Sequence, residues 1–551
     1  MSLYNYKRRR STVAHAGHVN IGGDNPVVVQ SMANTSTMDT AASAAQAIRI
    51  SEAGGELVRF TTQGVREAVN MAEIRRALDA AGCNVPLVAD VHFNPRAAFS
   101  AAETCQKVRI NPGNFVDAAR TFRKLEFTDE EYAAEIERIR RQLKPFLALC
   151  REHDTCVRLG VNHGSLSDRI MSRYGDTPAG MVESVMEYLR ICREENFDNI
   201  VISIKASNVT VMVETVRLLV AEMERESMAF PLHLGVTEAG DGEDGRVKSA
   251  VGIGTLLAEG IGDTIRVSLS EAPEAEIPVA RALRDYISLR SNHCAVKEPE
   301  TVRDGAARNH AILSGLLSHP YPVVAGLDYD RADTDDWHYA DASEEPHLYD
   351  DMLPVVLTSS HLNRVGEIAS WIDRFVAMDG RNPIVVRLSF DTSDPELLQV
   401  QAGADFGALL LNGYASGIDI VAPAFDENML HRVALGILQA ARLRISHTEY
   451  IACPSCGRTL FDLVATLAEV KAATAHLTGL KIGVMGCIVN GPGEMADADY
   501  GYVGAGPDRV SLYKGKELVL KNVTRAEALP ALIELIKANG DWREPGSAEE
   551  N

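Results

Sequence analysis

The amino-acid sequence predicts a three-part α/β protein: a closed (β/α)8 barrel, an inserted α/β domain and a small α+β domain. Three observations lead to this prediction. Eight short apolar runs alternate with amphipathic stretches between about residues 26 and 290. A polar connector begins at about residue 291, and three cysteines in two motifs mark the region after residue 446. We therefore expect domains over residues 1–290, 291–440 and 441–551.

The composition limits the class of protein. With 46% hydrophobic and 24% charged residues, the 551-residue chain resembles an ordinary globular protein. Its net charge of −21 argues against a nucleic-acid partner, because phosphate backbones require a basic surface. The sequence has no apolar run of membrane-spanning length and no apolar signal core near Met1, so we expect no membrane association. Nine cysteines without a secretion signal predict a reducing, cytoplasmic location.

The first domain is predicted from eight strands, nearly all followed by a helical stretch. Eight such units in roughly 250 residues is the number in a closed (β/α)8 barrel, whereas a doubly wound open sheet rarely needs so many. A capping box at residues 128–131 opens one long helix. The strands are expected at residues 27–31, 57–60, 87–90, 108–111, 156–160, 200–205, 232–237 and 264–268.

The other two domains are predicted from shorter patterns. In the inserted domain, buried strands are expected at residues 354–358, 383–388 and 408–411, and a helix at 428–441. In the last domain we expect helix 461–477, strand 481–485, a hairpin of 510–513 with 518–521, and a final helix after a capping box at 524–527.

Basic residues end five of the predicted barrel strands. Because active sites of such barrels lie at the carboxyl ends of the strands, we expect these side chains to meet at one mouth. Like charges so close repel one another unless an anion lies between them, and arginine binds phosphate oxygens with a two-pronged fork. The pattern predicts a substrate with at least two phosphate groups. The cations are Arg59, Arg109, Arg158, Lys205 and Arg266, with Asn111, Asn162 and Ser268 as further hydrogen-bonding candidates.

Two acids and two histidines complete the predicted ring. Glu238 is a candidate general acid if burial raises its pKa, but Glu238 and Asp90 are equally candidates for structural ion pairs with arginine. His92 and His163 are expected to be structural or to orient the substrate rather than to catalyse. A turn at residues 252–254 is a weaker candidate for a phosphate cradle at a helix start.

Three cysteines near the C-terminus form a second constellation: Cys453, Cys456 and Cys487. Three interpretations compete, namely a redox-active dithiol, a zinc site completed by His447 or His476, and a [4Fe–4S] cluster held by three cysteines. The dithiol leaves Cys487 unexplained, and neither histidine has a ligand-like spacing from a cysteine. With a cluster, the fourth iron is either open or bound by Glu494, which a flexible Asn-Gly-Pro-Gly loop can bring back to the metal.

The run Cys-Pro-Ser-Cys-Gly-Arg-Thr at 453–459 and the run Gly-Cys-Ile-Val-Asn-Gly-Pro-Gly-Glu at 486–494 are accompanied by five distinctive barrel segments. These lie at 29–32, 86–93, 109–114, 158–165 and 235–240. Together they resemble the 4-hydroxy-3-methylbut-2-enyl diphosphate synthase family of the methylerythritol phosphate pathway of isoprenoid biosynthesis. The resemblance covers residues 1–290 and 440–551, and the intervening domain resembles the insertion in the family's long form.

The resemblance implies a substrate, a cofactor and residue roles. The substrate is 2-C-methyl-D-erythritol 2,4-cyclodiphosphate, whose ring opens with two electrons delivered one at a time while the C3 hydroxyl leaves as water. Cys453, Cys456, Cys487 and Glu494 carry over as ligands of a [4Fe–4S] cluster, and Glu238 as proton donor. The five cations, with Asn111, Asn162 and Ser268, carry over as substrate binders.

The resemblance also implies partners. Reduced flavodoxin or ferredoxin is expected to supply electrons, and a homodimer is expected. The cysteine-bearing domain must close on a barrel mouth, either within one chain or between two. Two other functions remain open from the residues alone: a non-redox hydro-lyase that uses its cluster as a Lewis acid, and an iron–sulfur or zinc assembly protein.

Overall fold

A computed structural model of the chain describes residues 3–92, 94–117, 126–300, 321–488, 493, 495 and 497–545. These residues form two compact units, which are described separately. One comprises Arg10–Asp241, Gly262–Ala280 and His447–Asn551, and the other comprises Met1–Arg9, Gly242–Ile261 and Arg281–Ser446. The division into domains 1–290, 291–440 and 441–551 stays a prediction.

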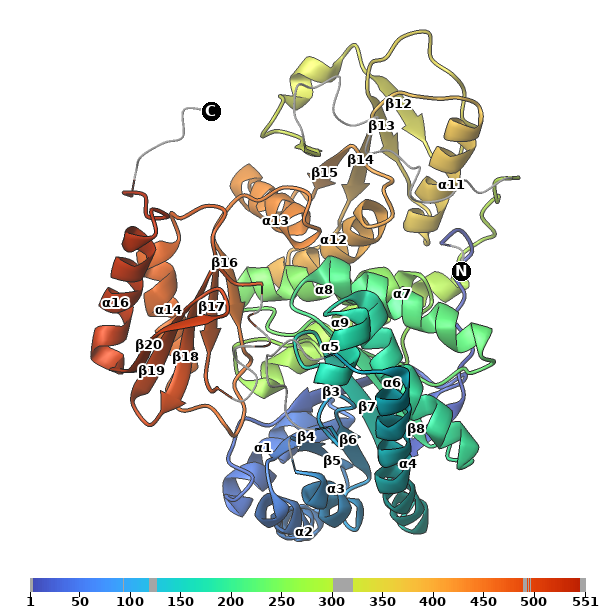
Figure 1. Cartoon of the computed structure of the whole chain (residues 1–551). Coiled ribbons are helices and arrows are strands. Elements are labelled where there is room, and N and C mark those ends of the chain that lie inside the picture. Colours follow the sequence, from blue (N-terminus) through green and yellow to red (C-terminus); the bar gives the residue numbers. More distant parts are fainter. Residues whose placement is uncertain are drawn as a thin grey trace. The chain divides into compact units, whose positions relative to one another are not determined.

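The predicted barrel is confirmed by an eight-stranded sheet in the first unit (Figure 1). Every pairing in it is parallel, and a bridge between Ile202 and Leu232 joins its two ends, so an open doubly wound sheet is excluded. The order around the sheet is β8-β7-β6-β5-β4-β3-β10-β9. The strands are β3 (Val28–Met32), β4 (Leu57–Thr62), β5 (Leu87–Val91), β6 (Lys107–Ile110), β7 (Cys156–Asn162), β8 (Ile200–Lys205), β9 (His233–Leu234) and β10 (Thr264–Ile265).

Helices follow the barrel strands, and most of those described begin at side-chain caps. Asp39 accepts a hydrogen bond from the N–H of Ala42 at the start of α1, and Thr128 and Glu131 form the predicted capping box of α4. Each cap satisfies N–H groups that have no partner inside the helix. The helices of this unit are α1 (Thr40–Glu52), α2 (Val65–Ala80), α3 (Pro95–Ala102), α4 (Asp129–Glu152), α5 (Asp168–Tyr174), α6 (Pro178–Glu194) and α7 (Val209–Arg225). Helix α8 (Gly242–Ala258) belongs to the second unit, and α9 (Glu276–Ser288) is divided between the two.

A small hairpin covers the amino-terminal end of the barrel. Its strands, β1 (Val13–Ala16) and β2 (Val19–Gly22), are antiparallel and were not predicted. Ile21 is fully buried and shares a cluster with Val28 and Leu57 at the starts of two barrel strands. Since this end is closed by apolar packing, the opposite, carboxyl end is left for a site.

The second unit contains a five-stranded parallel sheet in the order β11-β15-β14-β13-β12. Two of the three expected strands and the expected helix are present, but residues 408–411 end helix α12 instead of forming a strand. The cause is that a short apolar run looks alike in a buried helix and a buried strand. The strands are β11 (Val323–Val324), β12 (His338–Asp341), β13 (Val355–Thr358), β14 (Ile384–Ser389) and β15 (Gly417–Val421), with helices α11 (Arg364–Ala377), α12 (Pro395–Leu410) and α13 (Glu427–Ala440).

The suggested phosphate-binding turn at residues 252–254 is wrong. These residues lie inside α8, away from its start, and are buried. A Cβ atom added at Gly254 would lie 2.8 Å from the Cα atom of Ala404 in α12, and one at Gly407 would lie 2.8 Å from the Cα atom of Val251. The glycines therefore allow two helix backbones to approach closely, and they do not cradle an anion.

The cysteine motifs belong to a mixed five-stranded sheet with the order β16-β17-β18-β19-β20. The first three strands are parallel and the last two add an antiparallel hairpin, as predicted. Helices α14 and α16 cover one face of this sheet (Figure 1). The elements are β16 (Glu449–Ala452), β17 (Lys481–Met485), β18 (Tyr500–Gly506), β19 (Arg509–Lys514), β20 (Glu517–Thr524), α14 (Leu463–Thr474) and α16 (Arg525–Ala538).

Two general expectations can be compared with the described residues. Among them, no helix is both long and apolar enough to cross a membrane. All nine cysteines are described and none forms a disulfide. Of the six cysteines expected in the core, four are buried, but Cys83 is half-buried and Cys294 is exposed.

Candidate active site

A cavity at the mouth of the barrel is shared with the cysteine motifs, and both sets of residues belong to the same compact unit. It encloses roughly 710 Å³, including space open to solvent. Side chains from all eight barrel strands or the turns just after them line it, together with residues that follow β16 and β17. The predicted site residues among them are Arg59, Asp90, His92, Arg109, Arg158, Asn162, Lys205, Glu238, Arg266, Ser268, Cys453, Cys456 and Cys487.

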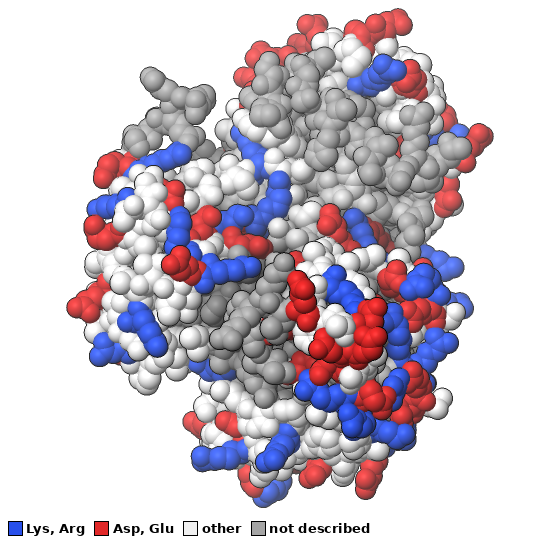
Figure 2. Space-filling model, in the orientation of Figure 1, with Lys and Arg blue, Asp and Glu red and all other residues white. Residues whose placement is uncertain are grey.

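The five predicted cations are all buried here, each at most 7% exposed. On the molecular surface, by contrast, acidic and basic side chains are interspersed on the face that Figure 2 shows. Buried cations are costly unless they are paired or bind an anion. The concentration of positive charge inside a chain of net charge −21 therefore marks a site for an anionic ligand.

Asp90, near the end of β5, is the carboxylate that holds part of this ring together. Its Oδ1 lies 3.2 Å from Nη1 of Arg109, and its Oδ2 lies 3.7 Å from Nε of Arg59. Nη2 of Arg158 is 3.9 Å away. Burial alone would raise the pKa of Asp90, but Arg59, His92, Arg109 and Arg158 together hold it well below its usual value. Asp90 is thus a permanent anion and not a proton donor.

His92 accepts a hydrogen bond and does not carry a charge. Nη1 of Arg109 lies 2.9 Å from its Nε2, and because a guanidinium only donates, Nε2 must be the acceptor. The ring proton then sits on Nδ1, which is 3.4 Å from the carbonyl oxygen of Asp90. Burial, followed by the positive charge of Arg458, lowers the pKa of His92 well below its usual value. His92 therefore orients Arg109.

Arg109 is fixed from a third direction by the backbone of β7. Its Nη2 donates to the carbonyl oxygen of Gly160 at 2.9 Å. A Cβ atom at Gly160 would lie 2.7 Å from Nε of Arg109 and 3.0 Å from Oγ of Ser203. The sequence did not indicate Gly160 as a site residue, yet only glycine leaves room for Arg109 in this position.

Several N–H groups of these arginines have no acceptor in the described part of the protein. They are Nε and Nη1 of Arg158 and Nε of Arg109, all buried. Burial, and then the charges of Arg59 and Arg109, lower the pKa of Arg158. An unsatisfied buried donor costs about 1–3 kcal/mol, and more when it is charged. Arg158 is therefore poised to donate to an anion that enters the cavity.

Arg266 is oriented by an acid that sequence reasoning missed. Its Nε and Nη2 donate to Oε2 and Oε1 of Glu276 at 3.0 and 2.8 Å, a two-pronged pair. Ser31 donates to the same carboxylate at 2.6 Å. Burial alone would lower the pKa of Arg266, but Glu276 raises it. No local pattern distinguishes Glu276 from the other acids at helix starts.

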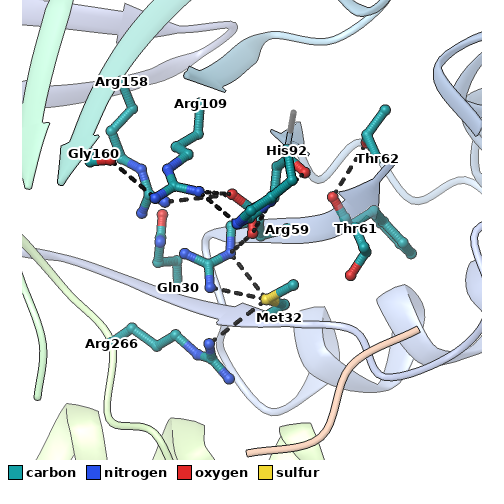
Figure 3. A network of polar contacts seen from close by, with 12 residues as sticks. Gln30, Met32, Arg59, Thr61, Thr62, His92, Arg109, Arg158, Gly160 and Arg266 are labelled. Carbon is teal, nitrogen blue, oxygen red and sulfur yellow. Dashed lines mark hydrogen bonds and ion pairs between the residues drawn. The ribbon is translucent and has the colours of Figure 1, made fainter. Parts of the chain in front are cut away.

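Met32 lines the cavity and lies between two arginines (Figure 3). Nε and Nη2 of Arg59 lie 3.1 and 2.8 Å from its sulfur, and Nη1 of Arg266 lies 3.7 Å from it. A thioether is a weak acceptor. A phosphate oxygen can therefore replace it as the partner of both guanidinium groups.

Lys205 and Glu238 occupy the other side of the mouth. Burial, then the charges of Arg59, Arg266 and Arg158, lower the pKa of Lys205, although Glu238 acts in the opposite direction. Glu238 is 4% exposed and has a φ of +49°, a left-handed conformation that is uncommon outside glycine and asparagine. Such strain persists at sites where the surroundings enforce it.

The cysteine-bearing domain is joined to the barrel beside Glu238. Ala239 forms a parallel bridge with Ala452, and Oγ of Ser270 donates to the carbonyl oxygen of Cys453 at 3.0 Å. Thus one chain brings the barrel mouth and the cysteines into one cavity.

The three cysteines share this cavity. Sγ of Cys453 accepts a hydrogen bond from the N–H of Gly486 at 3.3 Å. Burial and the neighbouring Cys456 raise the pKa of Cys453, so its thiolate needs a cation nearby. In the described part of the chain, no group of three His, Cys, Asp or Glu side chains is placed to hold a metal ion. Neither His447 nor His476 is among the described lining residues, and Nε2 of His476 lies 2.9 Å from the carbonyl oxygen of Arg543.

Two predicted site residues, Asn111 and His163, are placed differently. Asn111 holds two loops together, because its amide donates to Ser165 at 3.1 Å and accepts from Gly113 at 3.0 Å. Nε2 of His163 lies 3.7 Å from Oδ1 of Asp176. Neither Asn111 nor His163 is among the described lining residues. Glu494 lies outside the described residues.

The fold and the cavity define the class of protein: a (β/α)8-barrel enzyme whose anion-binding mouth is shared with a cysteine-bearing domain. Comparison with known families narrows the class. Residues 11–281 match the GcpE TIM-barrel domain, and residues 449–538 match the GcpE protein C-terminal domain.

Full-length relatives agree with these two matches. The chain is 52% identical to 4-hydroxy-3-methylbut-2-en-1-yl diphosphate synthase (flavodoxin) of Parabacteroides distasonis, over 98% of this chain and 100% of that protein. It is 41% identical to the protein of the same name from Akkermansia muciniphila, over 99% of each chain. The chain therefore belongs to the 4-hydroxy-3-methylbut-2-en-1-yl diphosphate synthase family, as its motifs predicted.

Replacing Gly160 by alanine should weaken anion binding without unfolding the barrel. The new methyl group displaces Arg109 from the cavity, so the affinity for inorganic pyrophosphate should fall roughly 10- to 100-fold, the loss of one charged hydrogen bond. Isothermal titration calorimetry measures this. Gly436→Ala is the matched control, because the nearest atom to its Cβ is 3.7 Å away. An unchanged affinity in Gly160→Ala would contradict the assigned role.

His92 should remain neutral, with its proton on Nδ1, throughout the pH range in which the protein is folded. Nitrogen NMR of the histidine rings measures the tautomer and the titration. In the unfolded chain, His92 takes up a second ring proton below about pH 6.5, whereas in the folded chain it does not. Acidification through that pH should therefore lower the free energy of unfolding. An imidazolium signal from His92 at pH 6 would be inconsistent with the hydrogen bond from Arg109.

Proposed function

We propose that this protein converts 2-C-methyl-D-erythritol 2,4-cyclodiphosphate to (E)-4-hydroxy-3-methylbut-2-enyl diphosphate. The observation that carries the proposal is the buried ring of cations, with N–H groups of Arg158 lacking acceptors, in the same cavity as three cysteines. A cyclic diphosphate has two adjacent phosphates that match such a ring. The names of the relatives, each a synthase of the product diphosphate, support the same reaction.

The barrel residues bind and orient the substrate. Arg59, Arg109, Arg158, Lys205 and Arg266 surround the two phosphates, and the proposed contacts of Asn162 and Ser268 add neutral hydrogen bonds. Asp90 and Glu276 hold three of the arginines in place before the ligand arrives. Binding energy is then not spent on ordering these side chains. His163 and Asn111 support the proposed site through their contacts with the loops that follow β6 and β7.

Cys453, Cys456 and Cys487 would hold a [4Fe–4S] cluster, with Glu494 as the fourth ligand. Thiolates select such soft centres. The cysteine sulfurs that would hold a four-iron cluster each bind a different iron, so they stand farther apart than the ligands of a single metal ion. When bound, the cluster supplies two electrons one at a time. The hydrogen bond from Gly486 to Cys453 stabilises the thiolate that this role requires.

Glu238 is the proposed proton donor. In the net reaction, two electrons enter, the bond between the ring carbon and the phosphate oxygen breaks, and the C3 hydroxyl departs. The departing oxygen takes a proton to leave as water, and Glu238 lines the cavity beside Ala239, where the barrel meets the cysteine-bearing domain.

A small reduced protein is the proposed electron donor, and flavodoxin is favoured because it appears in the names of the relatives. Nine cysteines outside disulfides are consistent with the proposed reducing, cytoplasmic setting. Because residues of one chain line both parts of the cavity, we propose that each subunit of the expected homodimer carries a whole site.

Anaerobic reconstitution with iron and sulfide, followed by turnover of the cyclodiphosphate with a chemical reductant, tests the proposal. The expected result is a four-iron cluster and reductant-dependent formation of the linear diphosphate. Turnover without a reductant would instead identify a hydro-lyase. Failure to form the cluster, or formation of a cluster without turnover, would refute the proposed function.

Glu494→Ala should leave the three cysteines able to assemble an intact or weakened cluster, but it should reduce turnover greatly because the fourth ligand is missing. Iron content and the electron paramagnetic resonance spectrum of the reduced protein report on the cluster, and Glu494→Gln tests whether a neutral oxygen ligand suffices. Full activity of Glu494→Ala would refute the ligand role.

A further inference from the structure

Arg458 is a sixth basic residue of the cavity, and it comes from the cysteine loop instead of the barrel. It lies two residues after Cys456 and before α14. The sequence indicated no separate role for it. Its side chain lines the same cavity as Arg59, Arg109 and His92.

The loop that carries Arg458 is anchored on both sides of it. On one side, a Cβ atom at Gly457 would lie 2.6 Å from the carbonyl oxygen of Thr35, so the loop backbone lies directly against the barrel. On the other side, the N–H of Thr459 donates to the carbonyl oxygen of Cys456 at 2.9 Å, and its hydroxyl accepts from the N–H of Cys456 at 3.0 Å. Arg458 therefore stands at the tip of a tight turn that faces the barrel mouth.

The electrostatic surroundings of Arg458 favour an anion beside it. After burial, its positive charge is the largest influence that lowers the pKa of His92, and the two side chains line the same cavity. His92 is itself the acceptor for Arg109. Six basic side chains thus line the cavity, against the carboxylates of Asp90 and Glu238. Without a ligand, Arg458 and the barrel cations repel one another.

We propose that Arg458 is a substrate-binding residue that binds a phosphate from the cysteine side, so that the diphosphate bridges the cysteine loop and the barrel cations. The inference rests on the proposed function for the identity of the substrate. An anion between the two groups of cations converts their repulsion into attraction on both sides. Arg458 and the barrel cations then bind the same substrate.

Phosphate binding by residue 458 explains why this residue is an arginine. A guanidinium can donate two parallel hydrogen bonds to one phosphate, which fixes direction as well as distance. Lysine retains the positive charge but cannot donate two parallel hydrogen bonds to one phosphate. The Arg458→Lys variant should therefore retain part of the affinity, whereas Arg458→Met, which has similar bulk and no charge, should not.

The test uses the full-length, cluster-loaded protein and inorganic pyrophosphate, with binding measured by calorimetry. We expect Arg458→Met to bind pyrophosphate roughly 10- to 100-fold more weakly than the wild type, and Arg458→Lys to lie between them. Thermal melting and the absorption spectrum of the cluster should be unchanged, which separates a binding role from a structural one. With the cyclodiphosphate, KM should rise in the same order.

Lys471→Met is the matched control. Lys471 lies in α14 of the cysteine-bearing domain and pairs with Asp241 of the barrel, but it is not among the lining residues described for the cavity. Its replacement should change pyrophosphate binding by no more than about twofold, since a partly exposed ion pair contributes little. An equal loss in Lys471→Met and Arg458→Met would overturn the specific role of Arg458.

The outcomes separate the two proposals. If the wild type turns over the cyclodiphosphate but Arg458→Met binds pyrophosphate as well as the wild type does, the role of Arg458 is wrong and the proposed function stands. If pyrophosphate binding falls in Arg458→Met but the wild type does not turn over the cyclodiphosphate, Arg458 binds phosphate and the proposed function is wrong. If the wild type does not bind pyrophosphate, the role of Arg458 is refuted, and turnover of the cyclodiphosphate alone decides the proposed function.

Discussion

Mutual repulsion among buried cations is the constraint on which the organisation of this site depends. Arg59, Arg109, Arg158, Lys205 and Arg266 converge within one cavity, each almost entirely removed from solvent. Two carboxylates, those of Asp90 and Glu276, hold three of the arginines, whereas Arg158 has N–H groups without acceptors among the described residues. Folding thus keeps an excess of positive charge that an anion neutralises.

The barrel can hold these buried charges because its two ends differ in structure. The β1–β2 hairpin closes the amino-terminal end with apolar packing, while the carboxyl ends of the strands supply the charges. Strand ends are held rigidly by the parallel sheet, so the cations meet at defined positions without long flexible loops. The cysteine-bearing domain then contributes a second wall, and the hydrogen bond from Ser270 to the carbonyl oxygen of Cys453 joins the two walls within one chain.

The barrel, its mouth and most cavity residues could be predicted from the sequence, because strand ends in a (β/α)8 barrel always converge. What could not be predicted depends on contacts between distant segments. Glu276 orients Arg266, and Gly160 leaves space for Arg109, but neither has a distinctive local pattern. The strand expected at residues 408–411 was wrong because burial on all sides removes the periodicity that separates a helix from a strand.

A crystal structure of the full-length protein with the cyclodiphosphate bound tests the central claim most directly. The quantity to measure is the distance from Nε and Nη1 of Arg158 to the nearest phosphate oxygens. We expect both nitrogens to lie within hydrogen-bonding distance, about 2.7–3.2 Å, of oxygens on the ligand. A ligand bound elsewhere, with these nitrogens still lacking acceptors, would contradict the account.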